Sequence, residues 1–124
     1  MASRSTLPVA LTIAGSDSGG GAGIQADLAT FQSLNVHGTS VLTAVTSQNP
    51  AKVAAIQPCT PAIVRSQLET VNAGFSLKAA KTGMLTNAQI VSVVVQFFRE
   101  NRRIPLIVDP VMISSSGVAL LDPQ

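Results

Sequence analysis

A glycine-rich segment between an apolar run and a helical pattern constrains this chain most. Five of the nine glycines lie between positions 15 and 23, directly after the apolar residues 9–13. Helically spaced apolar residues then begin at Ile24 and continue to Leu34. A strand, a glycine turn and a helix in this order bring backbone N–H groups close to a bound group. One or two glycines would satisfy a tight connection, so five favour the close approach of a ligand.

The same segment lacks the two common nucleotide-binding signatures. No Gly-Lys-Ser/Thr follows the glycines, which excludes a P-loop. The spacing of Gly19, Gly21 and Ile24 also departs from the dinucleotide fingerprint. The segment therefore predicts a ligand-binding turn of another kind.

Strand and helix patterns alternate along the chain, which predicts a single α/β domain with a largely parallel sheet. Thr60 and Pro61 mark one helix start, and Gly74 is the expected C′ residue of that helix. Thr86 and Gln89 predict a capping box at the next helix. Expected strands cover residues 8–14, 38–47, 52–57, 77–82 and 105–108, and expected helices cover 22–35, 61–74 and a stretch from 86 past 97.

Composition narrows the possible partners and the compartment. Only 11% of the residues are charged, which suits a parallel sheet covered on both faces. The net charge is +2, and no basic stripe is interleaved with aromatic residues, so we expect no nucleic-acid partner. Cys59 is the single cysteine, which fits a reducing compartment. A polar N-terminus and short apolar runs predict a cytoplasmic protein with no membrane partner.

Polar or glycine residues follow most of the expected strands, where ligands bind in open α/β sheets. We therefore expect one cleft lined by residues 15–17, 48–49, 82–84 and 109. Asp17 is interpreted as a turn former that orders the glycine loop. Lys81 is interpreted as a paired or snorkelling residue, and His37 and Cys59 as structural residues.

Asp27 is unusual because its carboxylate falls within the apolar stripe of the first helix. Stabilisation by the helix dipole is one explanation, but the second turn weakens it. A ligand with N–H donors is the preferred one, since an unpaired buried acid is costly. Gln48 suits the edge of a heterocycle, Met84 either stacks on a ring or joins the core, and Asp109 either holds a cation or caps a turn.

Four motifs in order resemble the hydroxymethylpyrimidine/phosphomethylpyrimidine kinases of thiamine biosynthesis. They are AGSDSGGGAGIQADL at 14–28, TAVTSQN at 43–49, KTGML at 81–85 and VDPVM at 108–112. The resemblance implies a ribokinase-like, three-layer α/β/α fold with a mostly parallel sheet. It implies phosphorylation of 4-amino-5-hydroxymethyl-2-methylpyrimidine, and then of its monophosphate, with ATP and Mg²⁺.

The resemblance also assigns residues. Asp27 and Gln48 would bind the pyrimidine, Gly15 and Met84 would shape its pocket, and Asp109 would belong to the magnesium and phosphate side. Two alternatives stay open. One is a pyridoxal or pyridoxine kinase of the same fold, and the other is a non-catalytic pyrimidine-binding module.

Family members are much longer than this chain. The resemblance implies that residues 1–124 are the N-terminal, substrate-binding half of one kinase domain, truncated after about the fifth strand. The ATP-binding and anion-hole half, with its Asn-x-x-Glu and Gly-Thr-Gly-Cys motifs, would lie outside these residues, as would the catalytic residue. We therefore expect negligible turnover by the chain alone, and self-association through an exposed sheet edge.

Overall fold

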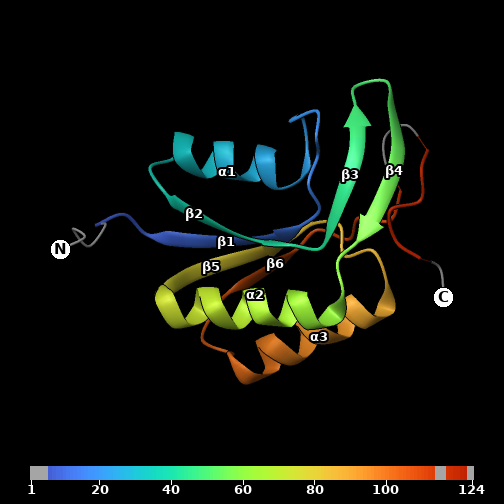
Figure 1. Cartoon of the computed structure of the whole chain (residues 1–124). Coiled ribbons are helices and arrows are strands. Elements are labelled where there is room, and N and C mark those ends of the chain that lie inside the picture. The colour runs from blue at the N-terminus through green and yellow to red at the C-terminus, as the bar shows by residue number, and fades with distance from the viewer. Residues whose placement is uncertain (1–5, 114–116, 123–124) are drawn as a thin grey trace.

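The fold is a parallel sheet with helices on both faces. The computed structural model describes residues 6–113 and 117–122. Its main sheet has four parallel strands in the order β2-β1-β5-β6. Helix α1 covers one face and helices α2 and α3 cover the other (Figure 1). The predicted three-layer arrangement is thereby confirmed. The elements are β1 (Val9–Ala14), α1 (Gly23–Ser33), β2 (His37–Leu42), β3 (Ala44–Asn49), β4 (Lys52–Pro58), α2 (Pro61–Gly74), β5 (Leu77–Thr82), α3 (Ala88–Glu100) and β6 (Leu106–Val108).

The single strand predicted over 38–47 is wrong. The structure divides this region into β2, which pairs with β1, and β3, which forms an antiparallel hairpin with β4. Thr43 lies at the break and is fully buried. Its N–H donates to the Ala14 carbonyl over 2.9 Å, and its hydroxyl donates to the Met84 carbonyl over 2.5 Å. These distant partners turn the chain out of the sheet, so the hairpin rises beside the carboxyl ends of the strands (Figure 1).

One of the three predicted helix-end signals is confirmed. The Thr60 hydroxyl accepts a hydrogen bond from the Ile63 N–H over 3.2 Å, as an N-cap should. Gly74 is the last helical residue rather than a left-handed C′ residue, and the extended Phe75 follows it. The capping box at Thr86 is also wrong.

Helix α3 takes Asn87 as its N-cap instead of Thr86. The Asn87 Oδ1 atom accepts from the Ile90 N–H over 3.0 Å. Thr86 has a positive φ of 70°, and its hydroxyl donates to the Leu85 carbonyl. Asparagine caps helices at least as well as threonine, so the neighbouring residue wins the position.

The apolar core lies between the sheet and helices α2 and α3. Leu11 and Ile13 of β1 are fully buried there. Helix α1, in contrast, has no buried residue. The sheet face below α1 carries polar side chains, including Thr12 and Lys81, which contact that helix. Burial of apolar surface therefore stabilises one side of the sheet, and the other side is left for polar chemistry. The core members contributed by the two helices are Val64, Leu68, Ile90, Val94 and Phe97.

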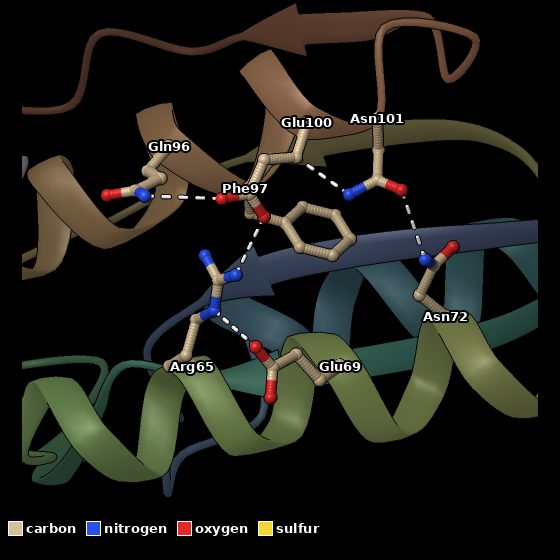
Figure 2. Close-up of polar contacts among 7 residues, drawn as sticks. All are labelled: Arg65, Glu69, Asn72, Gln96, Phe97, Glu100 and Asn101. Atoms are coloured by element: carbon tan, nitrogen blue, oxygen red, sulfur yellow. Dashed lines mark hydrogen bonds and ion pairs between the residues drawn. The ribbon is translucent and has the colours of Figure 1, made fainter.

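A polar network spans the outer surface between α2 and α3 (Figure 2). Arg65 contacts Glu69 over 2.5 Å and Glu100 over 2.7 Å. The Asn72 amide donates to Asn101 Oδ1 over 3.2 Å. Its hydrogen bond from Arg65 lowers the pKa of the Glu100 carboxyl. Exposed ion pairs of this kind contribute little stability, so the buried apolar contacts hold these helices together.

Candidate functional site

A pocket of about 230 Å³ opens at the carboxyl ends of the strands. It lies between the β1–α1 loop, the hairpin, and the ends of β5 and β6. All the residues assigned to a site from the sequence line this pocket: Gly15, Asp27, Gln48, Met84 and Asp109. The structure thus brings together residues that are up to 94 positions apart (109 − 15). Their roles in binding stay predictions.

Asp17 organises the glycine loop, as predicted. Its side chain is only 6% exposed. Oδ1 accepts from the Gly19 N–H over 2.8 Å, and Oδ2 accepts from the N–H groups of Gly21 and Ala22 over 2.9 and 2.8 Å. Ala22 is the N-cap of α1 and has no capping side chain of its own. The Asp17 carboxylate therefore satisfies N–H groups that the helix start leaves unpaired.

Gly15 makes room for Met84 at the pocket wall. A Cβ atom at position 15 would collide with the Met84 Cε methyl. Met84 is 9% exposed, and its carbonyl accepts the hydroxyl of Thr43. Met84 is therefore part of the packed interior and also a wall of the pocket, which combines the two alternatives considered from the sequence.

The hairpin is attached to the glycine loop at Gln48. The Ser18 hydroxyl accepts from the Gln48 N–H over 2.7 Å and donates to the Gln48 carbonyl over 2.9 Å. The β3–β4 register shifts between Ser47 and Gln48. Thr46 adds a bond from its hydroxyl to the Ser16 carbonyl over 2.6 Å. These bonds fix the segment that brings Gln48 to the pocket.

Asp27 is paired by the protein itself, which the sequence did not indicate. Its Oδ2 atom accepts from Lys81 Nζ over 2.8 Å and from the Thr12 hydroxyl over 2.6 Å. The expectation that only a ligand would satisfy this acid is therefore corrected. Lys81 is a paired residue, as interpreted, but its partner is 54 residues away. No local spacing could have revealed this pair.

Asp109 follows β6 and is exposed at the pocket. Its N–H donates to the Thr82 carbonyl over 3.3 Å, and its own carbonyl accepts from Val111 over 2.8 Å. Within the part of the chain that the structure describes, its carboxylate has no hydrogen-bond partner that would make it a turn cap. The carboxylate is therefore available to a cation or its water shell.

Two remaining interpretations concern single residues. His37 stacks on Phe75 with ring centroids 5.5 Å apart, which agrees with a structural role. Cys59 is a partly buried free thiol, and burial raises its pKa. A raised pKa disfavours the reactive thiolate, so the structural interpretation of Cys59 is supported.

Two kinds of feature are missing from residues 6–113 and 117–122. Every helix there is too short or too polar to span a bilayer. No three side chains of the His, Cys, Asp and Glu types come together as a metal-binding group there.

Comparison with known sequences identifies a family. The family model described as phosphomethylpyrimidine kinase matches residues 17–124. A hydroxymethylpyrimidine/phosphomethylpyrimidine kinase of Synechococcus elongatus is 52% identical over 116 residues, which are 94% of this chain and 44% of the relative. A kinase of the same name from Bacillus subtilis is 51% identical over 112 residues, 90% of this chain and 41% of that protein. The chain thus spans less than half the length of these relatives.

Solved structures give the same result. The crystal structure of a phosphomethylpyrimidine kinase from Clostridium difficile superposes with a TM-score of 0.85 at 45% identity, over 94% of this chain and 50% of that one. An ADP complex of Bacillus subtilis pyridoxal kinase gives 0.81 at 40% identity, over 87% of this chain and 41% of the other. The fold is therefore ribokinase-like, as the motifs implied. The chain belongs to the phosphomethylpyrimidine kinase family.

Proposed function

We propose that the protein to which these residues belong phosphorylates 4-amino-5-hydroxymethyl-2-methylpyrimidine, and then its monophosphate, for thiamine biosynthesis. One observation carries the proposal: a carboxylate, an amide and a methionine wall meet in one pocket at the strand ends. Relatives that share about half of the residues carry the name of this activity. A further relative from Geobacter sulfurreducens, 47% identical, is named a thiamine biosynthesis bifunctional protein.

In this proposal each pocket residue has a simple task. The Asp27 carboxylate accepts a hydrogen bond from the exocyclic amino group, and the Gln48 amide pairs with the heterocycle edge. Gly15 and Met84 shape the wall against the ring. The pocket thereby orients the hydroxymethyl group for attack, since phosphoryl transfer depends mainly on positioning and charge stabilisation.

ATP is the proposed co-substrate, with Mg²⁺ on the Asp109 side. A pyridoxal kinase of Staphylococcus aureus, 35% identical, has been solved with the ATP analogue AMP-PCP. The exposed Asp109 carboxylate fits Mg²⁺, which prefers one or two carboxylates together with water and phosphate oxygens. The ion would neutralise charge on the transferred phosphoryl group.

The domain assignment is part of the same proposal. Residues 1–124 would supply the substrate-binding half of one kinase domain, and the catalytic residue would come from the other half. Matched relatives of which this chain covers 41–45% support that division. A cytoplasmic location, without nucleic-acid or membrane partners, also stays a prediction.

A pyridoxal kinase is the second candidate, because structural neighbours of 40% and 37% identity carry that name. Calorimetric titration of the 124-residue chain with the hydroxymethylpyrimidine and with pyridoxal tests both candidates. We expect the pyrimidine to bind more tightly. Asp27→Ala or Gln48→Leu should weaken its binding about tenfold or more, since a hydrogen bond of about 1.5 kcal/mol or more is lost. The exposed Gln57, on β4, provides the control Gln57→Leu.

Phosphoryl transfer is measured with ATP, on the chain alone and joined to the remaining half of the Synechococcus relative. We expect transfer only from the joined protein. Tighter binding of pyridoxal would replace the proposed substrate. Unchanged pyrimidine affinity in both pocket variants would contradict the assigned pocket.

Self-association through β6 is the third part of the proposal. This strand lies at the edge of the sheet, and Ile107 and Val108 are 69% and 62% exposed. An apolar edge strand is a template for pairing with another copy. Sedimentation velocity should therefore show a larger species that grows with concentration. Ile107→Lys should reduce it, whereas Val95→Lys, on the outer side of α3, should not. A clean monomer at high concentration would contradict this prediction.

A further inference from the structure

The ion pair at the pocket has an asymmetric arrangement of donors. Thr12 and Lys81 are direct neighbours in the β1–β5 register. Both side chains reach the same oxygen of Asp27, Oδ2, over 2.6 and 2.8 Å. The sheet thus supplies two adjacent donors to one carboxylate oxygen on α1. This fixes the plane and the direction of the Asp27 side chain.

The second oxygen of Asp27 is left for the pocket. Among the described residues, Oδ1 has no hydrogen-bond partner. Thr82 Oγ1 is the one buried side-chain polar atom in that part of the chain without a partner, so Oδ1 is not shut away from solvent. Asp27 itself lines the pocket, with its side chain 19% exposed. A ligand donor that enters the pocket therefore meets Oδ1.

The chemistry of the two donors differs in a way that matters for recognition. A threonine hydroxyl can donate or accept, so it would tolerate a carboxylic acid as well as a carboxylate. A lysine ammonium has three donors and no acceptor, so it requires lone pairs on its partner. Lys81 therefore holds Asp27 as a carboxylate that only accepts hydrogen bonds.

We propose that Lys81 is a positioning residue that makes Asp27 select heterocycles with an amino group at the contacted edge. This inference rests on the proposed function, because it concerns how the same pocket recognises its pyrimidine. A 4-amino group donates to Oδ1. A 4-oxo group places an oxygen against Oδ1, which leaves two acceptors facing each other and unpaired.

A purely structural role for the pair would have different consequences. Helix α1 has no buried residue, so the pair also helps to attach it to the sheet. In that case removal of Lys81 would lower stability and weaken all ligands alike. A positioning role changes the ratio of affinities between the amino and oxo forms.

The test compares two probes on the 124-residue chain and its variants. Calorimetry gives the affinities for the 4-aminopyrimidine substrate and for its 4-oxo analogue. The original chain should prefer the amino form. In Lys81→Met, affinity for the amino form should fall about tenfold, the equivalent of one hydrogen bond to a charged group, and most of the preference should disappear. Lys81→Arg, another donor-only side chain, should restore part of the preference. Lys78→Met changes an exposed lysine on the same strand and should leave both affinities unchanged.

A measurement without ligand separates the two proposals. Three-bond NMR couplings report the Asp27 χ1 rotamer, which should be single in the original chain and in Lys81→Arg but averaged in Lys81→Met. Binding of neither pyrimidine to the original chain would refute the proposed function, and the rotamer would still decide whether Lys81 positions Asp27. An unchanged rotamer in Lys81→Met, or an unchanged ratio of affinities, would overturn the positioning role. Melting curves show that each variant is folded at the temperature used.

Discussion

Replacement of Gly23 with alanine is expected to destroy the glycine-loop structure and abolish ligand binding. Gly23 begins α1 with a φ of +58°, in the left-handed region that side chains other than glycine rarely occupy. A Cβ atom there would collide with the Gly15 carbonyl oxygen and lie 3.0 Å from the Asp17 nitrogen. Both are backbone atoms of the same loop, so neither can move aside without a change in the loop itself. We expect a loss of about 3 kcal/mol or more in the free energy of unfolding.

The collision also breaks a hydrogen bond that joins the strand to the helix. The Ile24 N–H donates to the Gly15 carbonyl over 3.0 Å, and this contact closes the turn beside the pocket. A displaced Gly15 would move away from Met84 and open the pocket wall. The loss of binding should therefore exceed what the loss of stability alone explains. Urea unfolding measures the first effect, and titration at a temperature where the variant stays folded measures the second.

Gly20 provides a matched control for this experiment. Its φ is +78°, so alanine meets the same backbone preference, but no atom lies within 4 Å of the added Cβ. Gly20→Ala should cost only about 1 kcal/mol and leave binding intact. The difference between the two variants isolates the close packing of backbone at position 23. Equal losses in both would mean that conformational preference alone explains the effect.

Local patterns in the sequence predicted the elements that local chemistry determines. The β1–glycine turn–α1 unit follows from apolar periodicity and glycine content. Thr60 and Pro61 act as a helix start because a side-chain acceptor and a fixed φ need no distant partner. The pocket residues were found because parallel strands bring their carboxyl ends to one edge, and a resemblance in four motifs supplied their assigned roles.

The features that the sequence missed depend on contacts between distant segments. Residues on both sides of Thr43 favour strands equally, and only its bonds to Ala14 and Met84 reveal where one strand ends. Asp27 and Lys81 lie on different elements, and their pairing depends on how α1 sits on β1 and β5. Such errors concern long-range geometry rather than propensity, which is a weak guide where tertiary contacts decide.

These contacts explain a division between the two faces of the sheet. The α2 and α3 face holds the large buried side chains, whereas the α1 face holds Thr12 and Lys81 under a helix with no buried residue. A polar network at the pocket costs desolvation that the opposite face must offset. Stability and recognition are therefore expected to respond to different substitutions.

Phe97→Ala tests that separation from the side of stability. Phe97 is the largest fully buried side chain among the described residues, 1% exposed, and its ring meets Phe98 edge to face at 5.1 Å. Its removal leaves a cavity between α3 and the sheet, and such changes cost about 3–5 kcal/mol. Domains of this size are stable by only about 5–15 kcal/mol, so the variant should be unfolded by much less urea. The Phe75→Ala control removes a ring that is 41% exposed and should cost about 1 kcal/mol.

The same variant should bind normally once it is folded. Phe97 lies on the opposite face of the sheet from Asp27 and does not line the pocket. At low temperature without denaturant, the folded fraction of Phe97→Ala should bind the pyrimidine within about twofold of the original chain, a difference of less than about 0.5 kcal/mol. Lys81→Met should show the reverse, with a smaller change in stability and a larger change in affinity. If Phe97→Ala weakened binding as much as Lys81→Met, the pocket would depend on packing across the whole sheet, and the two faces would not act separately.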